Sequence, residues 1–220
     1  MGENFKKRIY TSILLSCILT AMFFYSHIMI ISLIIISIIT WVEFYALISK
    51  IIKKDQIKDK LLRFFYKTLS LLYLSGLVYL ILVIESDFIS LKIYLFYSVL
   101  VAIMSDIGGL VFGKVFKGRK LSKVSPNKTI SGAIGSFIFS ISLIPIFYND
   151  QINQNLQSMF LITIIISLTS QLGDLFISLL KRKAKVKDTS NILPGHGGFL
   201  DRIDGIIFAI PVGIYLFIII

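Results

Sequence analysis

The chain has 220 residues, is 56% hydrophobic and carries a formal net charge of +11. Its mean hydropathy of +0.86 lies well above that of soluble domains. A single cysteine, Cys17, excludes an intramolecular disulfide and a cysteine-rich zinc site. The composition therefore excludes an ordinary soluble enzyme, and we interpret the basic charge as membrane topology and attraction to anionic lipid, not as binding to nucleic acid.

In chain order, about seven apolar runs predict transmembrane helices, because about 20 residues at 1.5 Å each cross the hydrocarbon core. Unpaired backbone groups are costly in lipid, so we predict an all-α, polytopic helical bundle that forms a single integral membrane domain over 1–220. Leu14–Cys17 resembles a bacterial lipoprotein cleavage site, but the chain stays apolar beyond it, so we expect an uncleaved first span. The predicted spans are 9–26, 28–48, 64–84, 90–113, 130–148, 158–180 and 203–220.

Lysine and arginine cluster in every second connection of the chain. All but Lys67 and Lys92 lie before the first span or in the segments 50–63, 114–128 and 181–202. The positive-inside rule then places the N-terminus and these three segments on the cytoplasmic side. Segment 50–63 has no glycine, histidine or serine, so we assign it only to topology and lipid attraction.

Acidic residues lie inside three predicted spans, at Glu43, Asp106 and Asp174. Each precedes the basic end of its span by seven or eight residues, which places it about 10–12 Å below the cytoplasmic boundary. Asp204 enters the last span from the same side. Carboxylates in a bilayer are functional candidates by default. A local ion pair or a hydrogen bond to a neighbouring helix is the alternative explanation for all three, and it fits Glu43 best. Glycines beside Asp106 and Asp174 favour close helix approach.

The segment 178–204 concentrates the polar chemistry of the chain. A basic cluster leads into a Pro-Gly-His-Gly-Gly turn and then to Asp201 and Asp204. If the last helix begins at Asp201, the spacing of three residues puts both carboxylates on one face, where they can hold a hard divalent cation. The glycines can bring backbone N–H groups close to an anion. His196 is a proton carrier, a phosphate donor or a turn residue; phosphoryl transfer favours the donor role.

A second polar segment, 113–129, carries six cations with three hydroxyls among them. Such a combination can clamp a triphosphate or a lipid phosphate.

Both segments resemble the phosphatidate cytidylyltransferase (CDP-diacylglycerol synthase) family. The detailed resemblance covers 106–132 and 173–205. It includes the signature 178–204 and a helix end followed by a Ser-Pro-x-Lys-Thr turn, here Asp106, Gly108, Phe112, Gly113 and 125–129. The family commonly has a glutamate where this chain has Ser131. The resemblance implies that phosphatidate and CTP give CDP-diacylglycerol and pyrophosphate, with Mg²⁺, at the cytoplasmic face of the cell membrane. It also allows K⁺ as a second cation and a homodimer.

Taken together, the residues and the resemblance predict a site in which carboxylates hold Mg²⁺ on the CTP phosphates while cations neutralise the triphosphate. The predicted catalytic residues are Asp201, Asp204, His196, Lys187 and Arg202. The predicted substrate contacts are Ser125, Asn127, Lys128, Thr129, Lys181, Arg182, Gly197 and Gly198. The predicted metal ligands are Asp174, Asp204, Asp188 and Asp106.

Other functions fit the sequence less well. A CTP-dependent kinase of a polyprenol-type lipid is the alternative, and it would release CDP where the transferase releases pyrophosphate. A CDP-alcohol phosphotransferase is disfavoured because its Asp-Gly-x-x-Ala-Arg element is absent from the sequence. A transporter needs a route to the far side of the membrane, yet the outer halves of the predicted spans carry no charge except Lys92.

Overall fold

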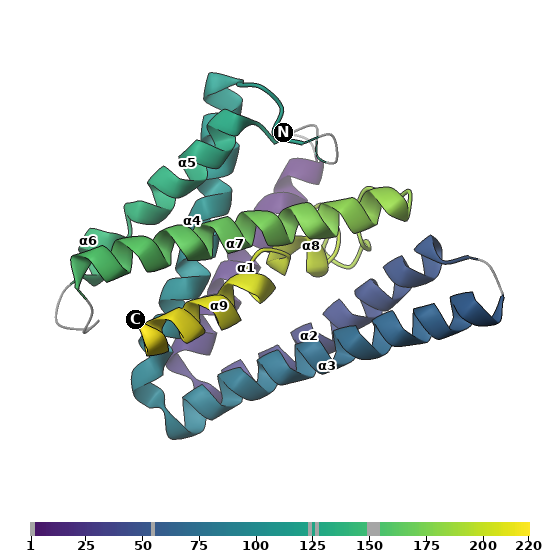
Figure 1. The fold of residues 1–220 in the computed structure, drawn as a ribbon, viewed down its shortest axis with the longest axis horizontal. Helices are drawn as coiled ribbons and strands as arrows, with labels where there is room; N and C mark the ends of the chain where they lie inside the picture. The colour runs from purple at the N-terminus through teal and green to yellow at the C-terminus, as the bar shows by residue number, and fades with distance from the viewer. Residues whose placement is uncertain (1–2, 54–55, 123–124, 126–127, 149–154) are drawn as a thin grey trace. The chain divides into compact units, whose positions relative to one another are not determined.

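A computed structural model describes residues 3–53, 56–122, 125, 128–148 and 155–220 of the chain (Figure 1). Within those residues helices are joined by loops and turns, and no β-strand is formed. The helices are α1 (Glu3–Phe24), α2 (Ser26–Ile51), α3 (Ile57–Asp87), the 3₁₀ turn η1 (Ile89–Leu91), α4 (Lys92–Phe116), α5 (Ile130–Ile141), α6 (Ile144–Phe147), α7 (Leu156–Lys183), α8 (Leu200–Ile203) and α9 (Ile206–Ile219).

Six helical segments among the described residues are long and apolar enough to cross a bilayer. The all-α prediction for a multi-pass membrane protein is therefore confirmed. The first predicted span is shorter than the others, because the apolar part of α1 runs only over Ile9–Phe24. The predicted span 130–148 is divided between α5 and α6, with Pro145 in the first turn of α6. Proline favours that position because the N–H it lacks would have no intrahelical partner there.

The chain divides into two compact units. The first unit comprises Met1–Glu85 and Leu180–Ile203, and the second comprises Ser86–Leu179 and Asp204–Ile220. In the first unit α2 and α3 lie side by side (Figure 1), and the indole N–H of Trp41 donates to the carbonyl oxygen of Lys67 at 3.2 Å. Helix α1 contacts α2, and α8 contacts α2. The loop 184–199 therefore belongs to the unit built around α2.

The second unit is held by a buried core at the meeting of α4, α6, α7 and α9. The hydroxyl of Tyr97 lies in this core, 2.6 Å from the hydroxyl of Thr163, so neither buried polar group lacks a partner. The buried members of the core are Tyr97, Val101, Ala102, Leu143, Ile144, Met159, Ile162, Ile166, Ala209 and Phe217.

Glycines bring α4 and α5 into backbone contact. A Cβ added at Gly135 would lie 2.7 Å from the carbonyl oxygen of Gly108, and one added at Gly132 would lie 2.8 Å from that of Gly109. Neither distance leaves room for a side chain, so this crossing requires glycine. Small residues at helix crossings are the usual route to tight packing in lipid, where the hydrophobic effect does not drive helices together. The prediction that the glycines beside Asp106 permit close approach is confirmed.

Candidate active site

Glu43 organises the loop that precedes α8. Its carboxylate, 2% exposed, lies on α2 and accepts four hydrogen bonds from the segment 189–200. Two come from hydroxyls, Thr189 at 2.8 Å and Ser190 at 2.6 Å. Two come from backbone N–H groups, Phe199 at 3.0 Å and Leu200 at 2.8 Å. Burying a carboxylate is costly unless its oxygens accept hydrogen bonds. The loop supplies those donors to Glu43, and Glu43 in turn holds the loop in one conformation.

The carboxylate of Asp201, in α8, also accepts hydrogen bonds from this loop. One carboxylate oxygen accepts from the ammonium of Lys181 at 2.7 Å. The other oxygen accepts from the N–H and hydroxyl of Thr189, at 2.8 and 3.0 Å, and from the N–H of Gly198 at 3.1 Å. Lys181 and Asp201 are 13% and 5% exposed, so the pair is largely removed from water. Asp201 thus ties the end of α7 to the loop and to the start of α8.

The glycine turn fits between these carboxylates. Gly195 and Gly197 have φ of 77° and 84°, a region that side chains disfavour. A Cβ on Gly197 would lie 3.1 Å from both the Cβ of Asp188 and a carboxylate oxygen of Asp201, and one on Gly198 would lie 2.8 Å from the carboxyl carbon of Glu43. The turn therefore needs glycine both for its backbone conformation and for the space its neighbours leave.

His196 and Arg202 lie on the outer side of this turn. The Nε2 atom of His196 lies 3.3 Å from the hydroxyl of Ser12. Arg202 donates to the carbonyl oxygen of His196 from Nε at 3.1 Å and from Nη2 at 2.5 Å. Thr11 donates to the carbonyl oxygen of Pro194 at 2.9 Å. Helix α1 and Arg202 therefore fix the backbone around His196, while the imidazole is only partly buried.

A second carboxylate cluster lies in the second unit. Asp174 on α7 forms an ion pair with Lys128, and the two side chains are 23% and 26% exposed. Its other oxygen accepts from the hydroxyl of Ser178 at 3.3 Å. The ammonium of Lys128 thus lies directly beside a carboxylate of a membrane-spanning helix.

Asp204 joins this unit at the turn between α8 and α9. It is 5% exposed, and one of its carboxylate oxygens accepts from the N–H of Gly205 at 2.9 Å. A Cβ on Gly173 would lie 2.8 Å from the carbonyl oxygen of Asp204, and a Cβ on Gly205 would lie 3.0 Å from that of Ser170. The backbone of α7 and this turn therefore meet at small residues, next to Asp174.

The expectation of one helix that carries both Asp201 and Asp204 was wrong. Helix α8 ends at Ile203 and α9 begins at Ile206, so Asp204 lies in the intervening turn. The turn forms because the Asp204 carboxylate accepts from the next N–H, a local bond that competes with helical hydrogen bonding.

Thr129 and Ser131 form the hydrogen bonds that connect the loop after α4 with the start of α5. Thr129 is the N-cap of α5, and its hydroxyl accepts from the N–H of Gly132 at 3.0 Å. Ser131 lies 3.0 Å from the same hydroxyl and accepts from the N–H of Gly118 at 3.2 Å. In place of the family's glutamate, Ser131 therefore ties the loop after α4 to the start of α5. The carbonyl oxygen of Ser125 accepts from the N–H of Lys128 at 3.1 Å, and Asn127 lies outside the described residues.

The remaining predicted residues are exposed. Asp106 lies on α4 with its side chain exposed, and Arg182, Lys187 and Asp188 are exposed around the end of α7 and the following loop. Within the described part of the chain no group of three or more His, Cys, Asp and Glu side chains is arranged to hold a metal. Their predicted roles toward substrate and cation remain predictions.

Thr189 and Ser190 were missed from the sequence, and Glu43 was noticed without a role in the site. The signal was present, because a buried acid needs donors and Asp-Thr-Ser follows the basic cluster directly. Pairing them required the tertiary structure, since 146 residues separate Glu43 from Thr189.

Comparison with known proteins agrees with the sequence signatures. A family model described as the Cytidylyltransferase family matches residues 2–220. The chain belongs to this family. A phosphatidate cytidylyltransferase of Staphylococcus haemolyticus is 46% identical over 121 residues, which are 54% of this chain and 46% of that protein. The corresponding protein of Staphylococcus aureus is 44% identical over 121 residues with the same shares.

A phosphatidate cytidylyltransferase of Rickettsia bellii is 44% identical over 124 residues, which are 50% of this chain and 54% of that protein. The chain thus spans about half the length of the curated relatives it matches. The family resemblance inferred from the sequence is confirmed.

Proposed function

We propose that this protein transfers CMP from CTP to phosphatidate, giving CDP-diacylglycerol and pyrophosphate. The observation that carries the proposal is the polar segment 181–204, which the structure holds in a defined conformation through Glu43 and Asp201. Family membership and relatives named phosphatidate cytidylyltransferase support the same reaction.

The reaction needs charge neutralisation more than acid–base chemistry. An oxygen of the phosphatidate phosphate attacks the α-phosphorus of CTP and forms a P–O bond. The bond from that phosphorus to the bridging oxygen breaks, and its electron pair leaves with pyrophosphate. The nucleophile is already an anion, so repulsion between the two phosphates is the obstacle. The exposed cations Arg182, Lys187 and Arg202 surround the organised loop and are suited to neutralise the triphosphate.

Mg²⁺ is the cation we propose for this reaction, and Asp174 and Asp204 are the residues that would hold it. Both belong to the second unit, on backbone segments that meet at Gly173, and hard carboxylate oxygens are the ligands that Mg²⁺ prefers. A site of two carboxylates suffices, because Mg²⁺ commonly completes its shell with water and substrate phosphates. When bound, the ion would supply Lewis-acid polarisation of the CTP phosphates. Lys128 beside Asp174 adds a phosphate-binding cation to the same unit.

We also propose that the polar segments of each unit face the cytoplasm of a bacterial cell. The basic segments that carry Lys128 and the loop 184–199 are those the positive-inside rule places on that side. Phosphatidate would reach the site from the inner leaflet, with its acyl chains among the helices. Nucleic acid has no part in this proposal, and a homodimer and a K⁺ ion remain expectations from the family resemblance.

Transfer of differently labelled CTP tests the reaction. Purified protein in detergent is incubated with phosphatidate, Mg²⁺ and CTP that carries ³²P at either the α or the γ position. Label from the α position is expected in the lipid, with pyrophosphate as leaving group. Label from the γ position in the lipid would identify a kinase and overturn the proposal.

The variant Asp204→Asn sharpens this assay. It should abolish turnover while the protein remains folded, because it removes one proposed metal ligand and keeps the size of the side chain. Asp87→Asn at the exposed end of α3 is the matched control and is expected to keep full activity. Full turnover by Asp204→Asn would remove the metal role given to that residue.

A further inference from the structure

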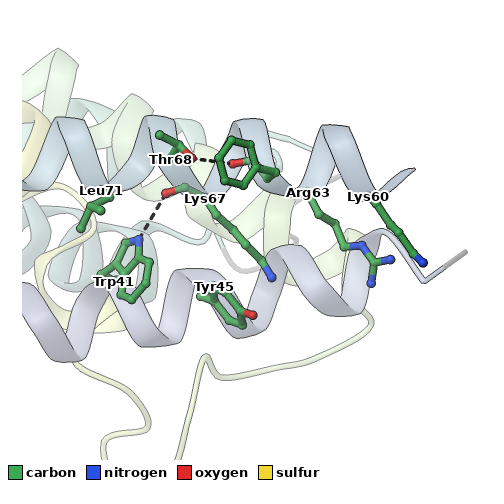
Figure 2. A pocket seen from close by; sticks show the side chains of 8 residues that line it. Trp41, Tyr45, Lys60, Arg63, Lys67, Thr68 and Leu71 are labelled. Atoms are coloured by element: carbon green, nitrogen blue, oxygen red, sulfur yellow. Dashed lines mark hydrogen bonds between the residues drawn. The ribbon is translucent and has the colours of Figure 1, made fainter. Parts of the chain in front are cut away.

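A cavity of about 450 Å³ lies between α2 and α3 (Figure 2). Both helices belong to the first unit, so the cavity is a feature of that unit alone. Trp41 and Tyr45 line it from α2, and Lys60, Arg63, Lys67 and Leu71 are among the residues that line it from α3. The α3 residues fall on one helical stripe, because their spacings of three and four residues place them one above the other.

The lining changes in character along the helices. Lys60 and Arg63 belong to the basic segment 50–63 and lie near the N-terminal end of α3, and none of the described lining residues is acidic. Further along α3, Leu71 lies beside Trp41, as Figure 2 shows. One end of the cavity is therefore positively charged and the other is aromatic and aliphatic. This combination matches a molecule with an anionic head and an apolar tail.

Lys67 is the decisive residue, and the positive-inside pattern left it unexplained. It lies inside the candidate span Ile57–Asp87, beyond the basic end of that helix. Its ammonium lies 3.2 Å from the centroid of the Tyr45 ring, and its carbonyl oxygen accepts from the indole of Trp41 at 3.2 Å. The ring stabilises one side of the ammonium by a cation–π interaction, and the ammonium's three N–H groups leave it able to donate elsewhere.

The cavity is separate from the candidate active site. Glu43 lies two residues from both Trp41 and Tyr45 on α2, so at 100° per residue it points to the opposite face of that helix. Its carboxylate accepts four hydrogen bonds from the segment 189–200. One face of α2 therefore organises the loop, and the other face lines the cavity.

We propose that this cavity binds an anionic phospholipid, with its phosphate among Lys60, Arg63 and Lys67 and one acyl chain along Leu71 and Trp41. Basic pockets between membrane helices recognise lipid headgroups in this way. The proposal is independent of the reaction proposed above, because it concerns a different face of α2 and requires no turnover.

Trp41 makes the site directly observable, because it is the only tryptophan in the chain. The full-length protein is reconstituted in phosphatidylcholine vesicles, and lipids brominated on one acyl chain are added as quenchers of its fluorescence. Brominated phosphatidate and phosphatidylglycerol are expected to quench at low mole fraction and to saturate. Brominated phosphatidylcholine is expected to quench only in proportion to its mole fraction. Equal quenching by the neutral lipid would overturn the proposal.

Two variants test the headgroup contacts. Arg63→Gln and Lys67→Met are each expected to weaken the saturable phase about fivefold, as is typical for one cation near an anionic headgroup. Lys58→Ala is the matched control, because this exposed lysine is on the same helix and does not line the cavity. Thermal unfolding in detergent identifies any variant that has lost its fold, and Arg63→Gln tests the site if Lys67→Met proves unstable. Weakening by the control equal to that of Arg63→Gln would reduce the effect to general surface charge and overturn the proposal.

Competition with soluble phosphates distinguishes binding of a lipid from binding of a free anion. Inorganic phosphate and glycerol 3-phosphate at millimolar concentration are expected to leave the quenching unchanged, because they lack the acyl chain that contacts Leu71 and Trp41. Displacement of the brominated lipid by inorganic phosphate alone would assign the cavity to a free anion and overturn the lipid assignment.

Discussion

Glu43 and Asp201 of the first unit differ from Asp174 of the second unit in how completely the protein itself satisfies their carboxylates. Glu43 accepts four hydrogen bonds from one loop, and Asp201 accepts three more from that loop and an ion pair from Lys181. The described contacts of Asp174 are an ion pair with Lys128 and one long hydrogen bond from Ser178, and its side chain is 23% exposed.

The difference indicates two roles for carboxylates, one structural and one in ligand binding. A buried carboxylate whose oxygens are all engaged holds a backbone in place, and its removal leaves buried donors without partners. A carboxylate with few protein donors keeps lone pairs for a cation or a substrate. We therefore infer that the first unit shapes the loop and that Asp174 contributes to the chemistry. Substitutions at these carboxylates and their partners test this division.

Asp174→Asn should nearly abolish catalysis and leave the fold intact. It removes the negative charge that attracts a cation but keeps the size of the side chain. We expect turnover of CTP and phosphatidate to fall by at least about 100-fold, as for other single groups that stabilise transition-state charge. Because Asp174 is partly exposed, the midpoint of thermal unfolding should change little. Wild-type turnover would contradict the chemical role of Asp174.

Glu43→Ala should lower the stability of the protein, and it should lower activity indirectly because the loop loses its fixed conformation. Four donors lose their acceptor, so we expect a loss of about 2–5 kcal/mol in the free energy of unfolding, since each unsatisfied buried donor costs about 1–3 kcal/mol and the loop can relax. Turnover should fall and the KM for CTP should rise, because the loop is no longer fixed.

Glu43→Gln provides the graded comparison, since its single carbonyl oxygen can still accept. It should recover part of the stability and part of the low KM. Glu85→Gln is the control, because the Glu85 carboxylate accepts from Ser26 in an exposed pair. An unchanged unfolding midpoint for Glu43→Ala would show that Glu43 does not organise the loop.

Lys181→Met should have the smallest effect of the three. It removes the ion pair with Asp201, while three other donors to that carboxylate remain. We expect a loss of about 1–2 kcal/mol, measured as a lower unfolding midpoint in detergent. Arg182→Met is the matched control, because the neighbouring cation is exposed. It should leave stability unchanged and weaken CTP binding instead. Equal loss of stability in both variants would contradict the distinction between the two cations.

Sequence patterns predicted the helices well, for a physical reason. A bilayer requires helical, continuously apolar segments, so length and hydropathy alone locate the spans. They predicted the helix ends less well. The run 130–148 is divided before Pro145, and the last span is interrupted at Asp204, because local caps and turns compete with the helix there.

The candidate site was only partly accessible from sequence. The cluster 178–204 and the carboxylates in the spans stood out because polar groups are rare in such a chain. The partner of Glu43 did not stand out, since Thr189 and Ser190 are ordinary loop residues until the fold brings them to α2. The contacts of Lys67 with Tyr45 and Trp41 were likewise hidden, because a helical stripe lines a cavity only when a second helix covers it.

Hydropathy alone predicted the membrane-spanning class, because a bilayer requires long apolar helices. The motifs within 106–132 and 173–205 indicated the family by resemblance and contain the residues from which a phosphate site could be built. The many hydrogen bonds to Glu43 and Asp201, and the few contacts of Asp174, are visible only in the folded chain. That distinction depends on donors far away in the chain, whose positions are set by the packing of helices at glycines and small residues.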